Sequence, residues 1–190
     1  MSMATVGQRS IRRFTSDEVW QMLEVGLLGE HEPYELIDGE LRYVSPQSPR
    51  HAQVIRSLWW HLAEAYRGSG QRVGVRLPIA GIADSIPEPD IAVAPAGTTS
   101  VTHHLRAADA VLLVEVSQSS AQSDRDTIVI DAAAGAAEYW IVDLAAETIG
   151  VFRGPQANGT WAVRLDIGST GVVRPPGTDA AMQVAAILHP

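Results

Sequence analysis

The stretches "PEPDIAVAP" (residues 87–95) and "VLLVEVSQSS" (residues 111–120) decide the fold of this chain. Each is rich in Val, Ile, Leu and Ala, which predicts a buried β-strand. The second contains a continuous apolar run, which is typical of a central strand covered on both faces. Each strand nevertheless carries one carboxylate, Asp90 or Glu115. Because a buried charge without a partner is costly, both positions indicate a specific role.

The sequence around these strands mixes helical and extended patterns. A capping box at Thr15 and Glu18 predicts a short helix, and apolar residues at helical spacing predict a second one over residues 51–66. Asp38-Gly39 predicts the turn of a hairpin. Further strands are expected over residues 71–81, 138–154 and 159–168, a helix over 123–135, and a polar loop over 96–108. We therefore expect a single α/β domain over residues 1–190, with a central mixed β-sheet flanked by helices.

The composition excludes several classes of chemistry. The 190 residues include no cysteine and no lysine, which removes disulfides, thiolate metal sites and every lysine-based mechanism. The formal net charge of −8 is unlike that of a high-affinity nucleic-acid binder, which usually presents a basic face. No apolar run approaches the ~20 residues needed to span a bilayer. The first residues, "MSMATVGQRSIRRF", contain no apolar signal region. We expect a cytoplasmic protein without membrane contact.

The two strand carboxylates are the main candidates for a site. Asp90 and Glu115 lie 25 positions apart on strands that we expect to be neighbours in the sheet. Carboxylates brought together repel each other unless they share a proton or a cation. Oxygen ligands favour Mg²⁺ or Mn²⁺, which activate a bound water and stabilise charge on phosphorus. The structural alternative is that Asp90 caps a turn and Glu115 pairs with an arginine.

Five blocks, in this order, resemble a known family: "YELIDGEL", "SPRHAQV", "PEPDIAV", "LLVEVSQSS…SDRDT" and "AAGAAEYWIVD". The Pro-Asp … Glu pattern resembles that of the PD-(D/E)XK nuclease superfamily, and the full set resembles its Uma-type family of restriction-endonuclease-like proteins. The resemblance implies a restriction-endonuclease-like fold and metal-dependent hydrolysis of phosphodiester bonds in DNA. It also implies a homodimer.

The same resemblance assigns roles to individual residues. Asp90 and Glu115 match the metal-binding and catalytic carboxylates, and Glu35 matches a further acidic ligand. His51 matches a histidine at the start of the long helix that could contact the substrate phosphate or order a water. The alternatives are that Glu35 is a surface carboxylate of the hairpin and that His51 caps or packs the helix.

The chain departs from the family pattern at the catalytic lysine. The lysine position falls on Ile128, or on Thr127 if the helix is one residue short, and Ser117 stands at the position used elsewhere in the superfamily. Arg125 is the candidate replacement cation, although it could equally be solvated or paired with a neighbouring aspartate. Two functions stay open: an endonuclease attenuated by this loss, and an inactive pseudo-nuclease that serves as a nucleic-acid-binding or oligomeric interaction module.

Other conspicuous side chains favour structural roles. Trp59 lies on the apolar stripe of the long helix and is expected in the core, whereas Trp60 is a candidate interface residue. His103 and His104 are expected to be solvated in the polar loop.

Overall fold

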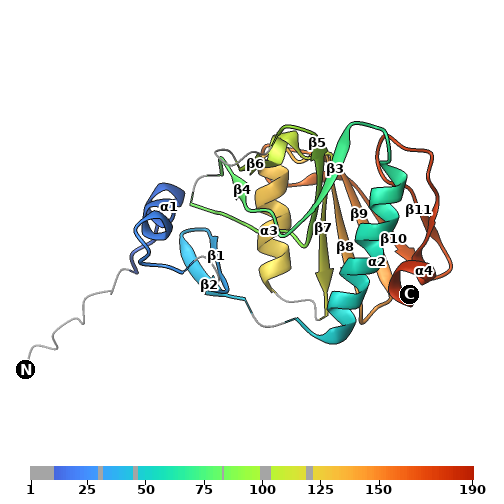
Figure 1. Ribbon diagram of the computed structural model, residues 1–190, viewed down its shortest axis with the longest axis horizontal. Coiled ribbons are helices and arrows are strands. Elements are labelled where there is room, and N and C mark those ends of the chain that lie inside the picture. The colour runs from blue at the N-terminus through green and yellow to red at the C-terminus, as the bar shows by residue number, and fades with distance from the viewer. Residues whose placement is uncertain (1–10, 30–31, 45–46, 83, 99–103, 119–121) are drawn as a thin grey trace, which may run out of the picture.

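A six-stranded mixed sheet forms the centre of the molecule (Figure 1). This computed structural model describes residues 11–29, 32–44, 47–82, 84–98, 104–118 and 122–190, and the side chains of residues 122–126 are outside that description. The strand order is β10-β9-β8-β7-β5-β3. The strands are β3 (Gln71–Val75), β5 (Ile91–Pro95), β7 (Leu112–Ser117), β8 (Glu138–Asp143), β9 (Thr148–Pro155) and β10 (Trp161–Gly168).

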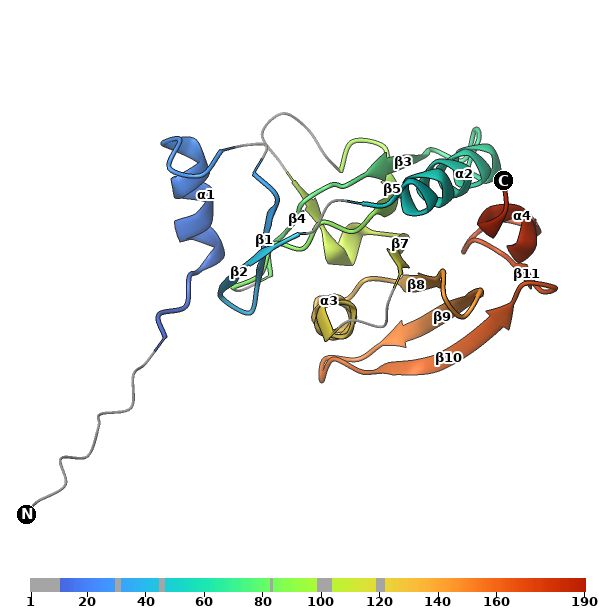
Figure 2. The same cartoon turned by 90° about the horizontal axis from the view of Figure 1, so that it is seen from below.

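The predicted central strand is confirmed. β7 pairs in parallel with β8 and antiparallel with β5, and all other neighbours in the sheet are antiparallel. Leu112, Leu113 and Val114 are completely buried, as expected for a strand with both faces covered. Helix α2 covers one face and helix α3 the other (Figure 2). The predicted α/β class and mixed sheet are therefore confirmed.

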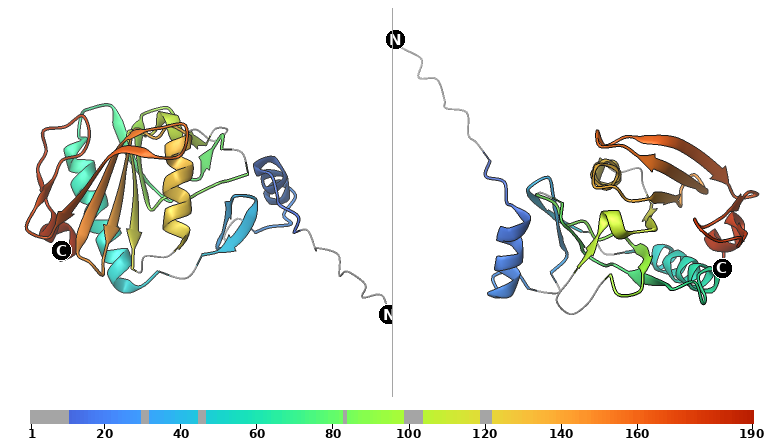
Figure 3. Two further views of the ribbon diagram at one scale, coloured as in Figure 1. Left: turned by 180° about the vertical axis from the view of Figure 1, so that it is seen from behind. Right: turned by 90° about the horizontal axis from the view of Figure 1, so that it is seen from above.

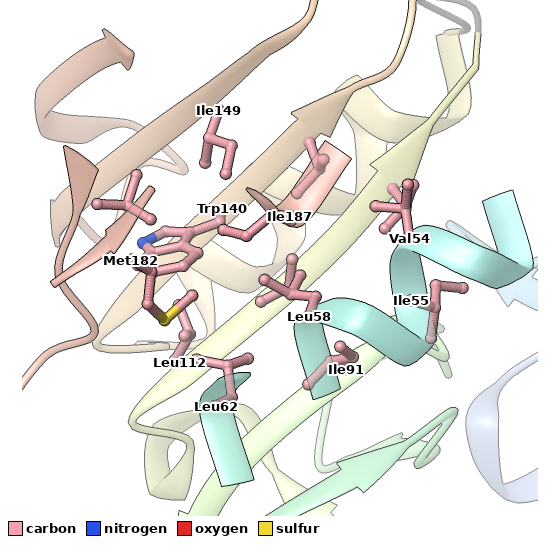
Figure 4. Close-up of a cluster of buried hydrophobic side chains, with 14 of the residues drawn as sticks. Val54, Ile55, Leu58, Leu62, Ile91, Leu112, Trp140, Ile149, Met182 and Ile187 are labelled. Atoms are coloured by element: carbon pink, nitrogen blue, oxygen red, sulfur yellow. The ribbon is translucent and has the colours of Figure 1, made fainter. Parts of the chain in front are cut away.

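Helix α2 (Pro49–Ala65) begins two residues before the predicted start, because Ser48 is its N-cap and Pro49 occupies its first turn. Its apolar stripe packs on the sheet with Trp140, Ile149 and the C-terminal segment (Figure 4). The buried positions of the stripe are Val54, Ile55, Leu58 and Leu62. Trp59 is 37% exposed, so its expected place in the core was wrong. It lies at the rim, where its indole N–H donates to the carbonyl of Val73 at 3.3 Å.

Helix α3 (Gln122–Ala133) covers the opposite face of the sheet. Ile128 packs there with Leu113 and Tyr139. The chain leaves this helix through Gly135, whose φ of 87° lies in the left-handed region that glycine adopts without strain. The predicted end of the helix is confirmed.

Helix α1 (Ser16–Glu24) and the hairpin of β1 (Tyr34–Ile37) and β2 (Glu40–Tyr43) lie beside the main sheet (Figure 3). The capping box of Thr15 and Glu18 is present as predicted. Asp38 and Gly39 both have positive φ, 51° and 76°, which is the signature of the predicted primed turn. A separate small apolar cluster of Val19, Leu36 and Ile86 holds these elements together.

Two short segments complete the fold. The expected polar loop contains strand β6 (Leu105–Arg106), which pairs in parallel with β4 (Ile79–Ala80), and the 3₁₀ helix η1 (Ala107–Asp109). Sequence alone missed them because their apolar content is a few residues only. The C-terminal segment forms β11 (Val172–Val173), β12 (Met182–Gln183) and α4 (Val184–Leu188). Within the described part of the chain, no helix is both long and apolar enough to cross a bilayer. The extent of a single domain over 1–190 stays a prediction.

Candidate functional site

Asp90 and Glu115 meet where the pairing of β5 and β7 ends. The ladder stops at Ile91 opposite Val114. Beyond that point, the backbone N–H of Asp90 donates to Glu115 Oε2 at 3.0 Å, and the N–H of Val116 donates to Asp90 Oδ2 at 2.9 Å. Each carboxylate thus binds the backbone of the neighbouring strand. These reciprocal bonds hold the two acidic side chains at one end of the central strands.

The imidazole of His51 closes this arrangement from helix α2. Its Nε2 lies 2.7 Å from the carbonyl oxygen of Val116 and 3.2 Å from Asp90 Oδ2. Both neighbours are acceptors, so Nε2 must carry the proton and donate. His51 is only 9% exposed. Burial acts to lower the pKa of His51, but its hydrogen bond to Asp90 and the charge of that carboxylate raise it overall.

The segment before α2 supplies further polar contacts that sequence reasoning missed. Gln47 Nε2 donates to Asp90 Oδ1 at 3.1 Å. Ser48 Oγ accepts from the backbone N–H of His51 at 3.2 Å and from the amide of Gln118. The Ser-Pro pair at residues 48–49 is a sequence signature of a helix start and could have located this cap. No comparable signal marks Gln47.

A basic side chain also lies near the carboxylates. The backbone N–H of Arg76 donates to the carbonyl of Asp90 at 3.3 Å, and its guanidinium lies 3.5 Å from Glu88. The charge of Arg76 is close enough to act on the pKa of His51, which it lowers. Nothing in the sequence distinguishes Arg76 from the other thirteen arginines, so its position was not predicted.

The oxygen atoms at this site could supply some, but not all, of the ligands of a hard divalent cation. Asp90 and Glu115 offer carboxylate oxygens, and Mg²⁺ commonly uses one or two protein carboxylates together with waters and substrate phosphates. Among the residues that the structure describes, no group of three or more His, Asp or Glu side chains is arranged to hold a metal. Asp90 and Glu115 are thus the two carboxylates that a metal could use at these strand ends, and such an ion would need further ligands.

Glu35 lies in β1, directly opposite Arg42 of β2. The charge of Glu35 is the smaller of the two causes that raise the pKa of Asp131 on helix α3. Its assignment as a third metal ligand stays a prediction. Arg125 belongs to α3, but its side chain is outside the described residues, and its predicted role as the replacement cation is likewise open.

Both lysine-equivalent positions are buried in α3. Ile128 belongs to the apolar cluster beneath the helix, and Thr127 is 6% exposed. Ser117, at the end of β7, is equally buried. Because Ile128 is enclosed by apolar side chains, a lysine there would lose solvation, whereas Thr127 already places a polar group in the interior.

Helix α3 also carries a buried acid that the sequence did not single out. Asp131 is completely buried, and neither of its carboxylate oxygens has a hydrogen-bond partner among the described residues. Burial, with a smaller contribution from Glu35, raises its pKa to about 8. One turn earlier on the same helix face lies Thr127. The sequence predicted this helix but not which of its faces is buried, because the apolar pattern of α3 is weak. The burial of Asp131 was therefore not predicted.

No curated protein matches the chain. Its structure is similar to the crystal structure of a "putative nuclease belonging to DUF820" from Anabaena variabilis, with 17% identity and a TM-score of 0.74 over 92% of this chain and 97% of that one. At this identity the likeness establishes the fold, which is restriction-endonuclease-like as predicted. A family model described as "Uma2: Putative restriction endonuclease" matches residues 18–176. The chain belongs to this Uma2 family.

Proposed function

We propose that this protein is a divalent-metal-dependent endonuclease that hydrolyses phosphodiester bonds of DNA through Asp90 and Glu115. The observation that carries the proposal is the reciprocal bonding of these two carboxylates at the ends of adjacent central strands. Membership of a family described as restriction endonucleases supports the choice of phosphodiester chemistry. A cytoplasmic location and a homodimer belong to the same proposal.

In this proposal Asp90 and Glu115 would hold Mg²⁺ or Mn²⁺, and the ion would supply an activated water and positive charge beside the scissile phosphate. His51 acts on Asp90 and not on the phosphate, since both acceptors of its Nε2–H belong to the protein. Its Nε2–H donates to Asp90 Oδ2 and to the Val116 carbonyl oxygen. These contacts hold the Asp90 carboxylate in one orientation, so that its other oxygen keeps a constant direction. In this proposal His51 is a positioning residue, and its predicted contact with substrate stays a prediction.

Because the catalytic lysine of the family is absent, we expect a low rate of phosphodiester cleavage. Removal of one group that stabilises transition-state charge commonly lowers kcat by about 10²–10³. Arg76 and Arg125 are the cations from which this chain could draw a replacement, although a guanidinium cannot act as a base. We therefore expect slow cleavage that depends on added Mg²⁺ or Mn²⁺.

The test is nicking of supercoiled plasmid with Mg²⁺ or Mn²⁺. We expect Asp90→Asn and Glu115→Gln to abolish nicking, because each removes a charged ligand while keeping the side-chain shape. Glu64→Gln is the matched control, since Glu64 is an exposed carboxylate on α2 paired with Arg67. Nicking that persists in both site variants would reject the assignment.

The lysine gap favours one second candidate, a pseudo-nuclease that binds nucleic acid or a protein partner without cleaving. Thr127→Lys distinguishes the two candidates, with Thr127→Met as a control of similar length and no charge. If wild type is inert and only the lysine variant cleaves, the carboxylates form an intact site that lacks its catalyst. Efficient cleavage by the wild type would remove this second candidate.

A further inference from the structure

Strand β10 is an uncovered edge of the central sheet. Its inner side pairs with β9 along its whole length, from Trp161 opposite Pro155 to Gly168 opposite Thr148. No strand of the described residues pairs with its outer side. Five successive residues, 162–166, are exposed, and Figure 2 shows β10 as the outermost strand. An edge of this length presents unpaired backbone donors and acceptors to any strand that can approach.

The opposite edge of the sheet is different. β3 has five residues, against eight in β10, and the indole of Trp59 donates to its Val73 carbonyl. Helix α2, which carries Trp59, therefore lies over part of that edge. Among the residues that the structure describes, none covers β10 in this way, so the two ends of the sheet are not equivalent as binding surfaces.

The two faces of β10 carry different kinds of side chain, charged on one and apolar on the other. Arg164 and Asp166 share one face, where the guanidinium lies 3.1 Å from the carboxylate and 5.3 Å from the centre of the Phe152 ring. Val163 and Leu165 share the other face and are 42% and 47% exposed. The strand thus combines two opposite charges, two residues apart, with exposed apolar side chains that a strand in solution would ordinarily avoid.

We propose that β10 pairs antiparallel with β10 of a second copy of this chain, with the two-fold axis at Leu165. The proposal specifies the homodimer included in the proposed function and does not depend on phosphodiester chemistry. It joins two central sheets edge to edge into one continuous sheet, through an interface in which both copies use the same residues.

Symmetry restricts the register to a few choices. Opposed residues of an antiparallel pair lie on the same face, so a two-fold axis normal to the sheet must pass through a residue position. An axis at Arg164 would oppose Arg164 to the partner's Arg164, and an axis at Asp166 would oppose two aspartates. An axis at Val163 would oppose Arg164 to the partner's Ala162. Only the axis at Leu165 opposes Arg164 to the partner's Asp166, and it does so twice.

The same register matches the apolar face. Leu165 opposes the partner's Leu165, and Val163 opposes the partner's Ile167. Directly opposed residues have Cβ atoms about 4.5–5.5 Å apart, and both apolar and opposite-charge pairs at that distance stabilise a sheet. Charge complementarity and apolar matching therefore select one register and one occupant, a second copy of this chain.

The charge pairs provide the first test, by sedimentation velocity. We expect Arg164→Asp and Asp166→Arg each to weaken the dimer at least tenfold, because each opposes like charges across the axis. A mixture of the two single variants should form a heterodimer, since one carries two acidic and the other two basic side chains. The double variant R164D/D166R should restore the dimer. Trp60→Ser, an exposed change on α2, is the control that should leave it unchanged.

The register is tested with single cysteines, which report cleanly because the chain has none. Leu165→Cys should give a disulfide-linked dimer on mild oxidation, because it opposes itself at the axis. Val163→Cys should not, because it opposes the partner's Ile167. A wild type that stays monomeric would overturn both the homodimer and this interface. A dimer that resists the β10 changes but is lost in Trp60→Ser would overturn the interface alone.

Discussion

Two aspartates in this molecule are almost equally buried and have opposite surroundings. Asp90 is 6% exposed and accepts hydrogen bonds from the Val116 backbone, from Gln47 and from His51. Asp131 is completely buried and has no hydrogen-bond partner among the described residues. Burial therefore does not identify a functional carboxylate. What distinguishes Asp90 is the set of donors that the strand ends and helix α2 direct at it.

The different surroundings of Asp90 and Asp131 lead to different effects on the stability of the fold. Hydrogen bonds to a charged carboxylate contribute more to stability than neutral ones, and leaving a buried donor unpaired costs about 1–3 kcal/mol. A buried carboxylate without donors is instead held protonated, which is why the pKa of Asp131 rises to about 8. The fold is expected to depend on the carboxylate of Asp90 and to tolerate, or benefit from, loss of the carboxylate of Asp131.

The largest expected effect is that of Asp90→Ala. The change leaves the Val116 N–H without its acceptor and removes the partner of His51, so we expect a loss of about 3 kcal/mol in the free energy of unfolding. Urea denaturation monitored by tryptophan fluorescence measures it. Asp109→Ala, at an exposed aspartate, is the control and should change stability by less than about 0.5 kcal/mol. Equal effects of the two changes would contradict the account of Asp90.

The next largest effect is a pH-dependent gain from Asp131→Asn. The raised pKa means that the folded state binds a proton which the unfolded state releases above pH 4. Stability therefore falls as pH rises from about 4 to about 8, and the loss is complete above that range. Removal of the ionisable group should therefore raise stability at pH 8 and change it little at pH 4.

Thermal unfolding of both proteins across pH 4–9 checks this prediction. A variant that is uniformly less stable than wild type at every pH would show that Asp131 is ionised and partnered in solution, and the contrast with Asp90 would be lost. A bound divalent ion would also satisfy Asp131, so the series is run with and without a chelator.

The smallest expected effect is that of His51→Phe. The variant keeps a ring on the buried face of α2 but removes the Nε2–H donor, and we expect a loss of about 1 kcal/mol. His51→Gln, which retains an N–H donor, should recover part of it. If His51 positions Asp90, both changes should alter the affinity for Mn²⁺ in the same order as they alter stability. Unchanged affinity in both would leave His51 a structural residue only.

Local sequence signals predicted the frame of the fold well. The capping box at Thr15 and the turn at Asp38-Gly39 depend on a few neighbouring residues, and both are present as predicted. The apolar run at residues 111–116 identified the central strand because a strand covered on both faces has no polar face to alternate with. The order of the strands in the sheet required the structure, since sequence neighbours need not be sheet neighbours.

The sequence predicted the two acidic residues of the site, but it did not predict the residues that contact them. The convergence of Asp90 and Glu115 followed from two adjacent strands of known character, but Gln47 and Arg76 reach the site from distant parts of the chain. The contacts of His51 with Asp90 and the Val116 carbonyl were not predicted, because residues so far apart in the sequence give no local signal. Asp131 was missed because a helix with a weak apolar pattern does not reveal which face is buried.

Calorimetric titration with Mn²⁺ tests most directly whether the two strand carboxylates form a metal site. The account predicts that wild type binds Mn²⁺, that Asp90→Asn and Glu115→Gln abolish this binding while remaining folded, and that Asp131→Asn binds as wild type does. Binding that survives both strand variants, or that is lost only in Asp131→Asn, would contradict it.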